Sequence, residues 1–248
     1  MAEHSKTHVV LSDVLPDGYI GYAGNLEVSV RFELTEANGL RTESRASTDA
    51  PTLCNFKTHK YCNFDGGADT RDYYLRVKVD QLRPGGNDCI PTGEIAAVPG
   101  SRFDFKKSDS FFSGNFEELD HSFCLNESGY IAAAFSSTRS YIWCELMTAD
   151  PGLQVYTGQA ASAPPIGPFA GNLLEPQIWP FAPNQPEFHG AVLHPGEFCV
   201  QPSVFRLTKR GAGLNACAPE KSHRPHRLAG WVPETYGSGQ SDVRHSTY

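Results

Sequence analysis

One short segment constrains the fold of this chain more than any other feature. From Leu26 to Leu34, apolar and polar side chains alternate without a break. Successive side chains of a β-strand point to opposite faces, so this pattern places one apolar and one polar row along a strand. The segment from Tyr74 to Asp80 repeats the alternation. The chain is therefore predicted to form sheets that bury one face.

Further short strand candidates follow, and turn signals separate them. Asn38-Gly39, Pro84-Gly-Gly86 and Asp150-Pro-Gly152 are typical of turns between strands. No window of eleven or more residues shows a helical period, and the 23 Gly and 18 Pro also disfavour helices. We predict an all-β fold, an antiparallel β-sandwich. The additional strand candidates are 130–135, 140–146 and 153–156.

The alternating pattern also predicts the domain boundaries. It ends near Arg206, and residues 207–248 are rich in Gly, Pro, Ser and His. We expect residues 9–206 to form one sandwich domain, preceded by a short extension at residues 1–8. We expect residues 207–248 to be a disordered tail.

Composition narrows the partners and the compartment. The formal net charge of −7 gives no broad attraction for phosphate backbones, so we expect no nucleic-acid partner. The seven cysteines are odd in number, form no C-x-x-C pair and lie partly in apolar runs, which favours reduced thiols. No apolar stretch approaches the length of a membrane span. These features predict a soluble cytoplasmic protein that does not bind membranes.

Three polar positions are candidates for chemistry on residue type alone. His59 lies in a polar loop ahead of a turn, where an imidazole can exchange protons with a ligand, although most lone histidines are surface or core residues. Glu175 lies between two leucines and Trp179, a setting that suits a general base but also occurs at strand ends. Asp120 and His121 precede an apolar run, where the pair could orient a base, bind a metal or cap a turn. No second acidic or histidine cluster lies at metal-ligand spacing, so no metal is expected.

Several enzyme classes lack their sequence markers. The chain has no G-x-S-x-G elbow, no P-loop and no G-x-G-x-x-G segment. Hydrolase, nucleotide-binding and dinucleotide-binding functions are therefore not indicated.

Four ordered segments together resemble the aldose 1-epimerase (galactose mutarotase) family, over about residues 9–206. The loop that carries His59 is similar to the family motif Asn-Leu-Thr-Asn-His-x-Tyr-Phe-Asn-Leu-x-Gly, and the segment around Glu175 is similar to a second motif. The matching segments are Asn55 to Gly66, Ile90 to Glu94 with Phe103 to Phe105, Leu119 to Phe123, and Asp150 to Glu197.

The resemblance implies a sandwich of the galactose mutarotase type and a chemistry that interconverts sugar anomers. In the family pattern, Glu175 would be the base for the anomeric hydroxyl and His59 the acid for the ring oxygen. Asp120, Gln154 and Tyr156 would bind the sugar. The resemblance implies no metal and no organic cofactor, and it predicts an isomerase of carbohydrate metabolism.

The chain also departs from the family pattern. The family's strands before the Pro-Asp-Gly motif, with a Leu-His-Gly-Gly segment that carries a second active-site histidine, have no match here, so an N-terminally truncated sandwich is expected. Truncation would expose an apolar sheet face or an unpaired strand edge, which a homo-oligomer could cover. Two alternatives to a mutarotase stay open, a repurposed isomerase or cyclase and a non-catalytic carbohydrate-binding protein. The chain also carries residues other than those usual in the family motifs at Lys57, Thr58, Cys62 and Phe181.

Overall fold

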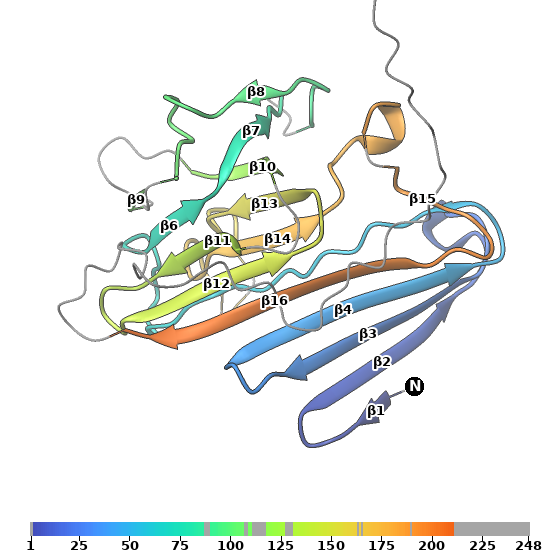
Figure 1. Cartoon of the computed structure of the whole chain (residues 1–248), viewed down its shortest axis with the longest axis horizontal. Helices are drawn as coiled ribbons and strands as arrows, with labels where there is room; N and C mark the ends of the chain where they lie inside the picture. Colours follow the sequence, from blue (N-terminus) through green and yellow to red (C-terminus); the bar gives the residue numbers. More distant parts are fainter. Residues whose placement is uncertain are drawn as a thin grey trace, which may run out of the picture.

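The computed structural model describes most of the chain as antiparallel sheets (Figure 1). It describes residues 2–86, 90–106, 109–110, 118–126, 131–162, 164, 166–188 and 190–210. Within these ranges there is no α-helix, and the helical turns are the 3₁₀ segments η1 (Tyr19–Gly21) and η2 (Ala182–Asn184). The predicted all-β sandwich is confirmed. No helix in this part of the chain is long and apolar enough to cross a bilayer.

The larger of the two main sheets is an antiparallel sheet of nine strands. Its two ends are far apart in Figure 1, with β1 and β2 at the blue end and β6 and β9 at the green end. In spatial order the strands are β1 (Ala2–His4), β2 (His8–Leu15), β3 (Leu26–Leu34), β4 (Gly39–Thr48), β16 (Cys199–Lys209), β12 (Ile142–Thr148), β11 (Ile131–Ser136), β6 (Tyr74–Val77) and β9 (Asp109–Ser110).

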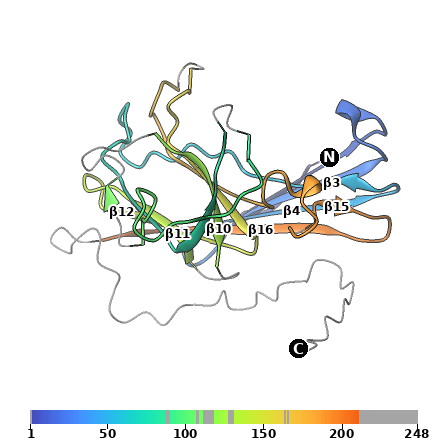
Figure 2. The same cartoon turned by 90° about the horizontal axis from the view of Figure 1, so that it is seen from above.

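A second sheet of five strands packs against part of the first, and a third sheet is a single pair. In the view from above, β3, β4 and β15 lie toward one end of the molecule and β12 toward the other (Figure 2). The five strands are β14 (Leu173–Gln177), β13 (Gly152–Tyr156), β10 (Asp120–Leu125), β7 (Val79–Arg83) and β8 (Ala96–Ala97). The pair is β15 (Val192–Leu193) with β5 (Thr52–Leu53).

The two segments with the clearest alternation have different outcomes. Residues Leu26–Leu34 form β3 with the predicted bounds. The segment predicted as one strand from Tyr74 to Asp80 is divided into β6 in the nine-stranded sheet and β7 in the five-stranded sheet. Leu75, Val77 and Val79 are all fully buried, because the chain passes from one sheet to the other around a shared core. In this segment alternation predicted the buried residues but not the crossing, whereas in β3 no residue is buried and Leu34 is 62% exposed.

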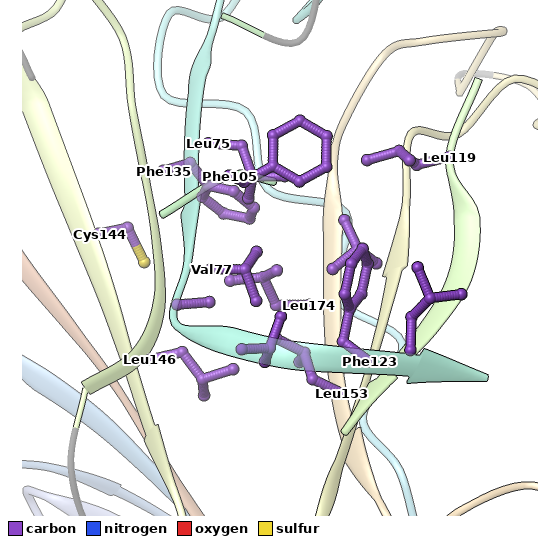
Figure 3. Packing of buried hydrophobic residues seen from close by; sticks show 14 of the residues in the cluster. Leu75, Val77, Phe105, Leu119, Phe123, Phe135, Cys144, Leu146, Leu153 and Leu174 are labelled. Carbon is purple, nitrogen blue, oxygen red and sulfur yellow. The ribbon is translucent and has the colours of Figure 1, made fainter. Parts of the chain in front are cut away.

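The core lies between the two main sheets (Figure 3). Leu75, Phe135 and Leu146 come from the nine-stranded sheet, and Phe123 and Leu153 come from the five-stranded sheet. All five are fully buried. Burial of each such side chain stabilises the fold by about 1.5–3 kcal/mol, so this interface fixes how the second sheet sits on the first.

Both ends of the sandwich extend past the predicted boundaries. Residues Ala2–His4, expected to be an extension outside the domain, form β1 and pair with β2. At the other end, β16 runs to Lys209 because it stays paired with β12, as in the pair Ile142 and Lys209. The predicted boundary at residue 206 therefore lies inside a strand. Residues 211–248 of the predicted tail lie outside the described residues.

Candidate active site

The register of the five-stranded sheet places four polar side chains in one row across four strands. Arg83 on β7 is opposite Ser122 on β10, Ser122 is opposite Gln154 on β13, and Gln154 is opposite Glu175 on β14. Directly opposed residues of an antiparallel pair project from the same face. Because Phe123 is a core residue and adjacent side chains alternate, this row lies on the face turned away from the core.

Glu175 is the buried carboxylate of this row, with 2 % of its side chain exposed. Its Oε2 accepts a hydrogen bond from the Lys57 ammonium at 2.9 Å. The Nε2 atom of His59 lies 3.3 Å from Oε1, but the two are not aligned as a hydrogen bond. Buried Oε1 consequently has no hydrogen-bond partner among the described residues. Lys57 therefore holds Oε2 of the carboxylate, whereas Oε1 can still accept a hydrogen bond or a proton beside the His59 imidazole.

His59 lies in the loop between β5 and β6, and hydrogen bonds tie this loop to the two residues that flank β14. The Asn55 amide donates to the Ile178 carbonyl at 3.2 Å and accepts from the Ile178 N–H at 2.9 Å. Further along, Cys62 and Asn172 exchange two backbone hydrogen bonds of 2.9 and 3.1 Å. These contacts bracket the loop, so they position His59 over Glu175.

The other predicted ligand-binding residues lie on the same face of the sheet. The Gln154 amide donates to Asp120 Oδ1 at 2.7 Å. Tyr156 is directly opposite Asp120, and its hydroxyl accepts a hydrogen bond from the Ala160 N–H at 2.9 Å. The structure thus brings together Glu175, Gln154, Asp120 and Tyr156 from three strands, with His59 from the loop. Carboxylate, amide and phenol groups in this arrangement can bind a ligand that carries several hydroxyls.

Two residues near His59 belong to the site although sequence reasoning assigned them no role. Lys57 binds Glu175, and the Tyr61 ring lies 5.2 Å from the His59 ring. Burial, followed by the nearby Tyr156 and Glu175, raises the pKa of Tyr61. Lys57, His59 and Tyr61 are spaced two residues apart, the period that places side chains on one side of an extended segment. This two-residue spacing from His59 is the feature of the sequence that could have indicated Lys57 and Tyr61 as site residues.

His121 provides a contrast with Asp120 next to it. It lies opposite Val155, and its ring packs 4.6 Å from the Phe103 ring. Val155 and Phe103 belong to the core region. The structure therefore places His121 on the core side of β10 and Asp120 on the side of Glu175.

Comparison with known proteins identifies the family. The family model described as aldose 1-epimerase matches residues 1–206. This chain belongs to the aldose 1-epimerase family. The galactose mutarotase of Rattus norvegicus is 35% identical over 216 residues, which cover 81% of this chain and 63% of that protein. The aldose 1-epimerase of Escherichia coli is 30% identical over 201 residues, which cover 73% and 58%.

Solved structures of similar proteins share the fold. The GalM/aldose epimerase homologue from C. elegans matches with a TM-score of 0.80 at 23% identity, over 85% of this chain and 69% of that one. The galactose 1-epimerase from Lactobacillus acidophilus matches with a TM-score of 0.73 at 26% identity, over 85% and 66%. The chain spans less than two thirds of the length of the curated relatives above.

A separate cavity of about 330 Å³ is lined by none of the candidate site residues of this family member. Its lining includes Tyr19, Tyr22, Phe56 and Trp179, but no carboxylate and no imidazole. Acid–base chemistry therefore points to the face that carries Glu175. In the described part of the chain, no three His, Cys, Asp or Glu side chains are placed to hold a metal ion.

Proposed function

We propose that this protein interconverts the α and β anomers of a hexose by acid–base opening of the sugar ring. Membership of the family supports the reaction class. The observation that carries the assignment of residues is the buried Glu175, whose Oε1 accepts no hydrogen bond from a described residue and lies 3.3 Å from His59 Nε2. Glu175 is the base and His59 the acid.

The proton balance of the reaction suits a base and an acid that lie side by side. Glu175 takes the proton from the hydroxyl oxygen O1, while a protonated His59 gives a proton to the ring oxygen O5. The C1–O5 bond breaks and an open-chain aldehyde forms. Because O1 and O5 are both bonded to C1, one pair of adjacent groups reaches both atoms. After rotation about the C1–C2 bond, the same transfers in reverse close the ring on the other face.

The remaining site residues bind and orient the sugar in this proposal. Lys57 holds Oε2 of Glu175 and so leaves Oε1 for the substrate hydroxyl. Asp120, Gln154 and Tyr156 hold hydroxyls farther along the sheet. The family relatives give no such support to the repurposed isomerase or to the non-catalytic binding protein.

The direct test is polarimetry of freshly dissolved α-D-glucose and α-D-galactose with the full chain. We expect faster equilibration than the spontaneous rate, and we expect Glu175→Gln to remove the acceleration. A chain that is folded by circular dichroism but gives only the spontaneous rate with both sugars would contradict the proposal.

We also infer that the protein forms homo-oligomers. Leu11 on β2 and Leu34 on β3 are 49% and 62% exposed, and they lie on the same face of the nine-stranded sheet. Exposed apolar side chains on a sheet near its edge favour association. Light scattering on the purified chain should give the mass of a dimer or larger, and a monodisperse monomer at high concentration would contradict this inference.

The cytoplasm is the compartment that we propose for this protein. Cys54, Cys124, Cys144 and Cys199 are buried free thiols, and such thiols are typical of a reducing compartment.

A further inference from the structure

Arg83, at the end of β7, is a buried cation whose guanidinium donates no hydrogen bond to a described residue. Its side chain ranks among the largest fully buried ones, and the residue is 2% exposed. In the described part of the chain, its three guanidinium nitrogens have no hydrogen-bond partner. Burial lowers the pKa of Arg83, while Cys124 and the nearby Glu187 oppose that shift. A buried charge is normally paired, so an unpaired guanidinium calls for a partner that binds there.

Aromatic rings cover the guanidinium but leave its donors unused. The Phe188 ring centroid lies 3.7 Å from the central carbon of Arg83, and the Trp179 ring centroid lies 5.6 Å away. Stacking on a ring uses the flat face of a guanidinium, whereas its N–H groups point outward in the plane. The segment that carries both rings is anchored at Trp179, whose Nε1 donates to the Pro151 carbonyl at 2.7 Å.

A second unpaired polar group lies beside Arg83. Ser122 is the next residue in the row, and its hydroxyl is buried without a hydrogen-bond partner among the described residues. Unsatisfied buried polar groups are rare in folded proteins, so two in adjacent positions indicate a shared ligand. The row continues through Gln154 to Glu175, three strand spacings and therefore about 14 Å from Arg83 at the level of the backbone.

We propose that Arg83 and Ser122 form a subsite for an anionic group of the substrate, a carboxylate or a phosphate. This proposal rests on the anomer-interconverting function proposed above and makes the preferred substrate an acidic sugar, either a hexuronic acid or a hexose phosphate. The planar guanidinium donates two parallel hydrogen bonds to such a group, and the Ser122 hydroxyl donates a third. C1 of the same sugar faces Glu175. Phe188 moves aside to admit the ligand, because its ring covers the guanidinium of Arg83.

The test compares Arg83→Met with the matched control Arg45→Met in the full chain. Arg45 is exposed and also stacks on a ring, with its central carbon 4.2 Å from the Phe198 centroid, but it lies on β4 of the other sheet. Melting temperatures are measured with and without sodium glucuronate, glucose 6-phosphate, inorganic phosphate and galactose. The ratio of kcat/KM for each acidic sugar to that for galactose is measured by anomer-exchange NMR.

We expect at least one anion to raise the melting temperature of the wild type and of Arg45→Met but not of Arg83→Met. The ratio of kcat/KM should fall about 10- to 100-fold in Arg83→Met, the range expected for losing hydrogen bonds to a charged group. A larger rise in melting temperature with glucuronate identifies a carboxylate as the group recognised, and a larger rise with glucose 6-phosphate identifies a phosphate. Without ligand, Arg83→Met should melt no lower than the wild type, because it removes an unpaired buried charge.

Three results would overturn the subsite. They are no anion-dependent shift in the wild type, an equal shift in Arg83→Met, or an Arg83→Met chain that does not fold, which would show that the guanidinium is needed for packing against Phe188. Failure of the proposed function is distinguishable from these results. Anion stabilisation that depends on Arg83 without anomer exchange of any sugar would keep the subsite and reject the reaction. Exchange of galactose without any anion effect would keep the reaction and reject the subsite.

Discussion

The two faces of the five-stranded sheet come from the same strands but differ in chemistry. One face is the apolar core, and the other carries the polar side chains of the candidate site. Phe123, Leu153 and Leu174 face the nine-stranded sheet and are at most 1% exposed. Their neighbours Ser122 and Glu175 are also buried, but each has a side-chain oxygen without a hydrogen-bond partner among the described residues. The core face is filled by apolar contacts within the chain, whereas the opposite face keeps polar groups that have no hydrogen-bond partner among the described residues. Substitutions one residue apart should therefore have different effects.

The largest effect is expected for Glu175→Gln on the polar face. The amide cannot accept the hydroxyl proton, so anomer exchange should fall by about 10²–10⁴-fold. The nearly equal shape should leave the circular dichroism spectrum unchanged. Polarimetry measures the loss, and substantial residual catalysis would show that another group is the base.

On the core face, Phe123→Ala should act on stability and not on chemistry. The change leaves a cavity between the sheets and should lower the free energy of unfolding by about 3–5 kcal/mol, measured in urea. The fraction that remains folded should keep near-native specific activity. A folded variant that is stable but inactive would remove the distinction between the faces.

A pair of histidines tests the comparison at the level of single side chains. His59→Ala removes the acid beside Glu175 and should reduce anomer exchange by about 10²-fold. His121→Ala changes a ring that packs on Phe103 and should cost activity much less. Equal losses in the two variants, with folding intact, would mean that the wrong histidine has been assigned.

Lys60 places a cation at the margin of the core side, 4.5 Å from the Phe205 ring centroid. Burial lowers the pKa of Lys60 to about 8. Below a pH of about 8, Lys60 is protonated in both the folded and the unfolded chain. The free energy of unfolding is then lowered by the full cost of burying the ammonium. Between about 8 and the ordinary value of 10.5 only the unfolded chain holds the proton, so stability rises with pH.

Lys60→Met should therefore raise the free energy of unfolding at pH 7 by roughly 1–2 kcal/mol. Its advantage should shrink between pH 8 and about 10.5, as the wild type gains stability. Urea titrations at several pH values measure this, and an advantage that is constant with pH would refute the assignment to Lys60.

The smallest effect is expected for Ser122→Ala. Ser122 is adjacent to Phe123 in the sequence but lies on the opposite, polar face of the sheet. Its hydroxyl is buried and has no hydrogen-bond partner among the described residues, so its removal should change the free energy of unfolding by less than about 1 kcal/mol and toward higher stability. The free energies of unfolding of Ser122→Ala and Phe123→Ala, measured in urea under the same conditions, give the contrast directly. A loss as large as that of Phe123→Ala would show that the hydroxyl is satisfied in the folded protein.

The sequence by itself predicted the all-β class, the buried residues of the segment 74–80 and the family to which the chain belongs. Alternation from Leu26 to Leu34 predicted β3, and ordered motifs predicted Glu175 and His59, because side-chain period and motif order are local properties of a chain. The same local reasoning could not see that the segment from Tyr74 to Asp80 crosses between two sheets.

Only the tertiary structure decided which distant residues meet. The contact of Lys57 with Glu175 and the row that joins Arg83 to Glu175 depend on strand order and register. Register is set by how whole sheets bury their apolar faces and not by any single segment, and a shift of one residue would turn every side chain of a strand to the other face. The polar row exists because the apolar row on the other side fixes that register.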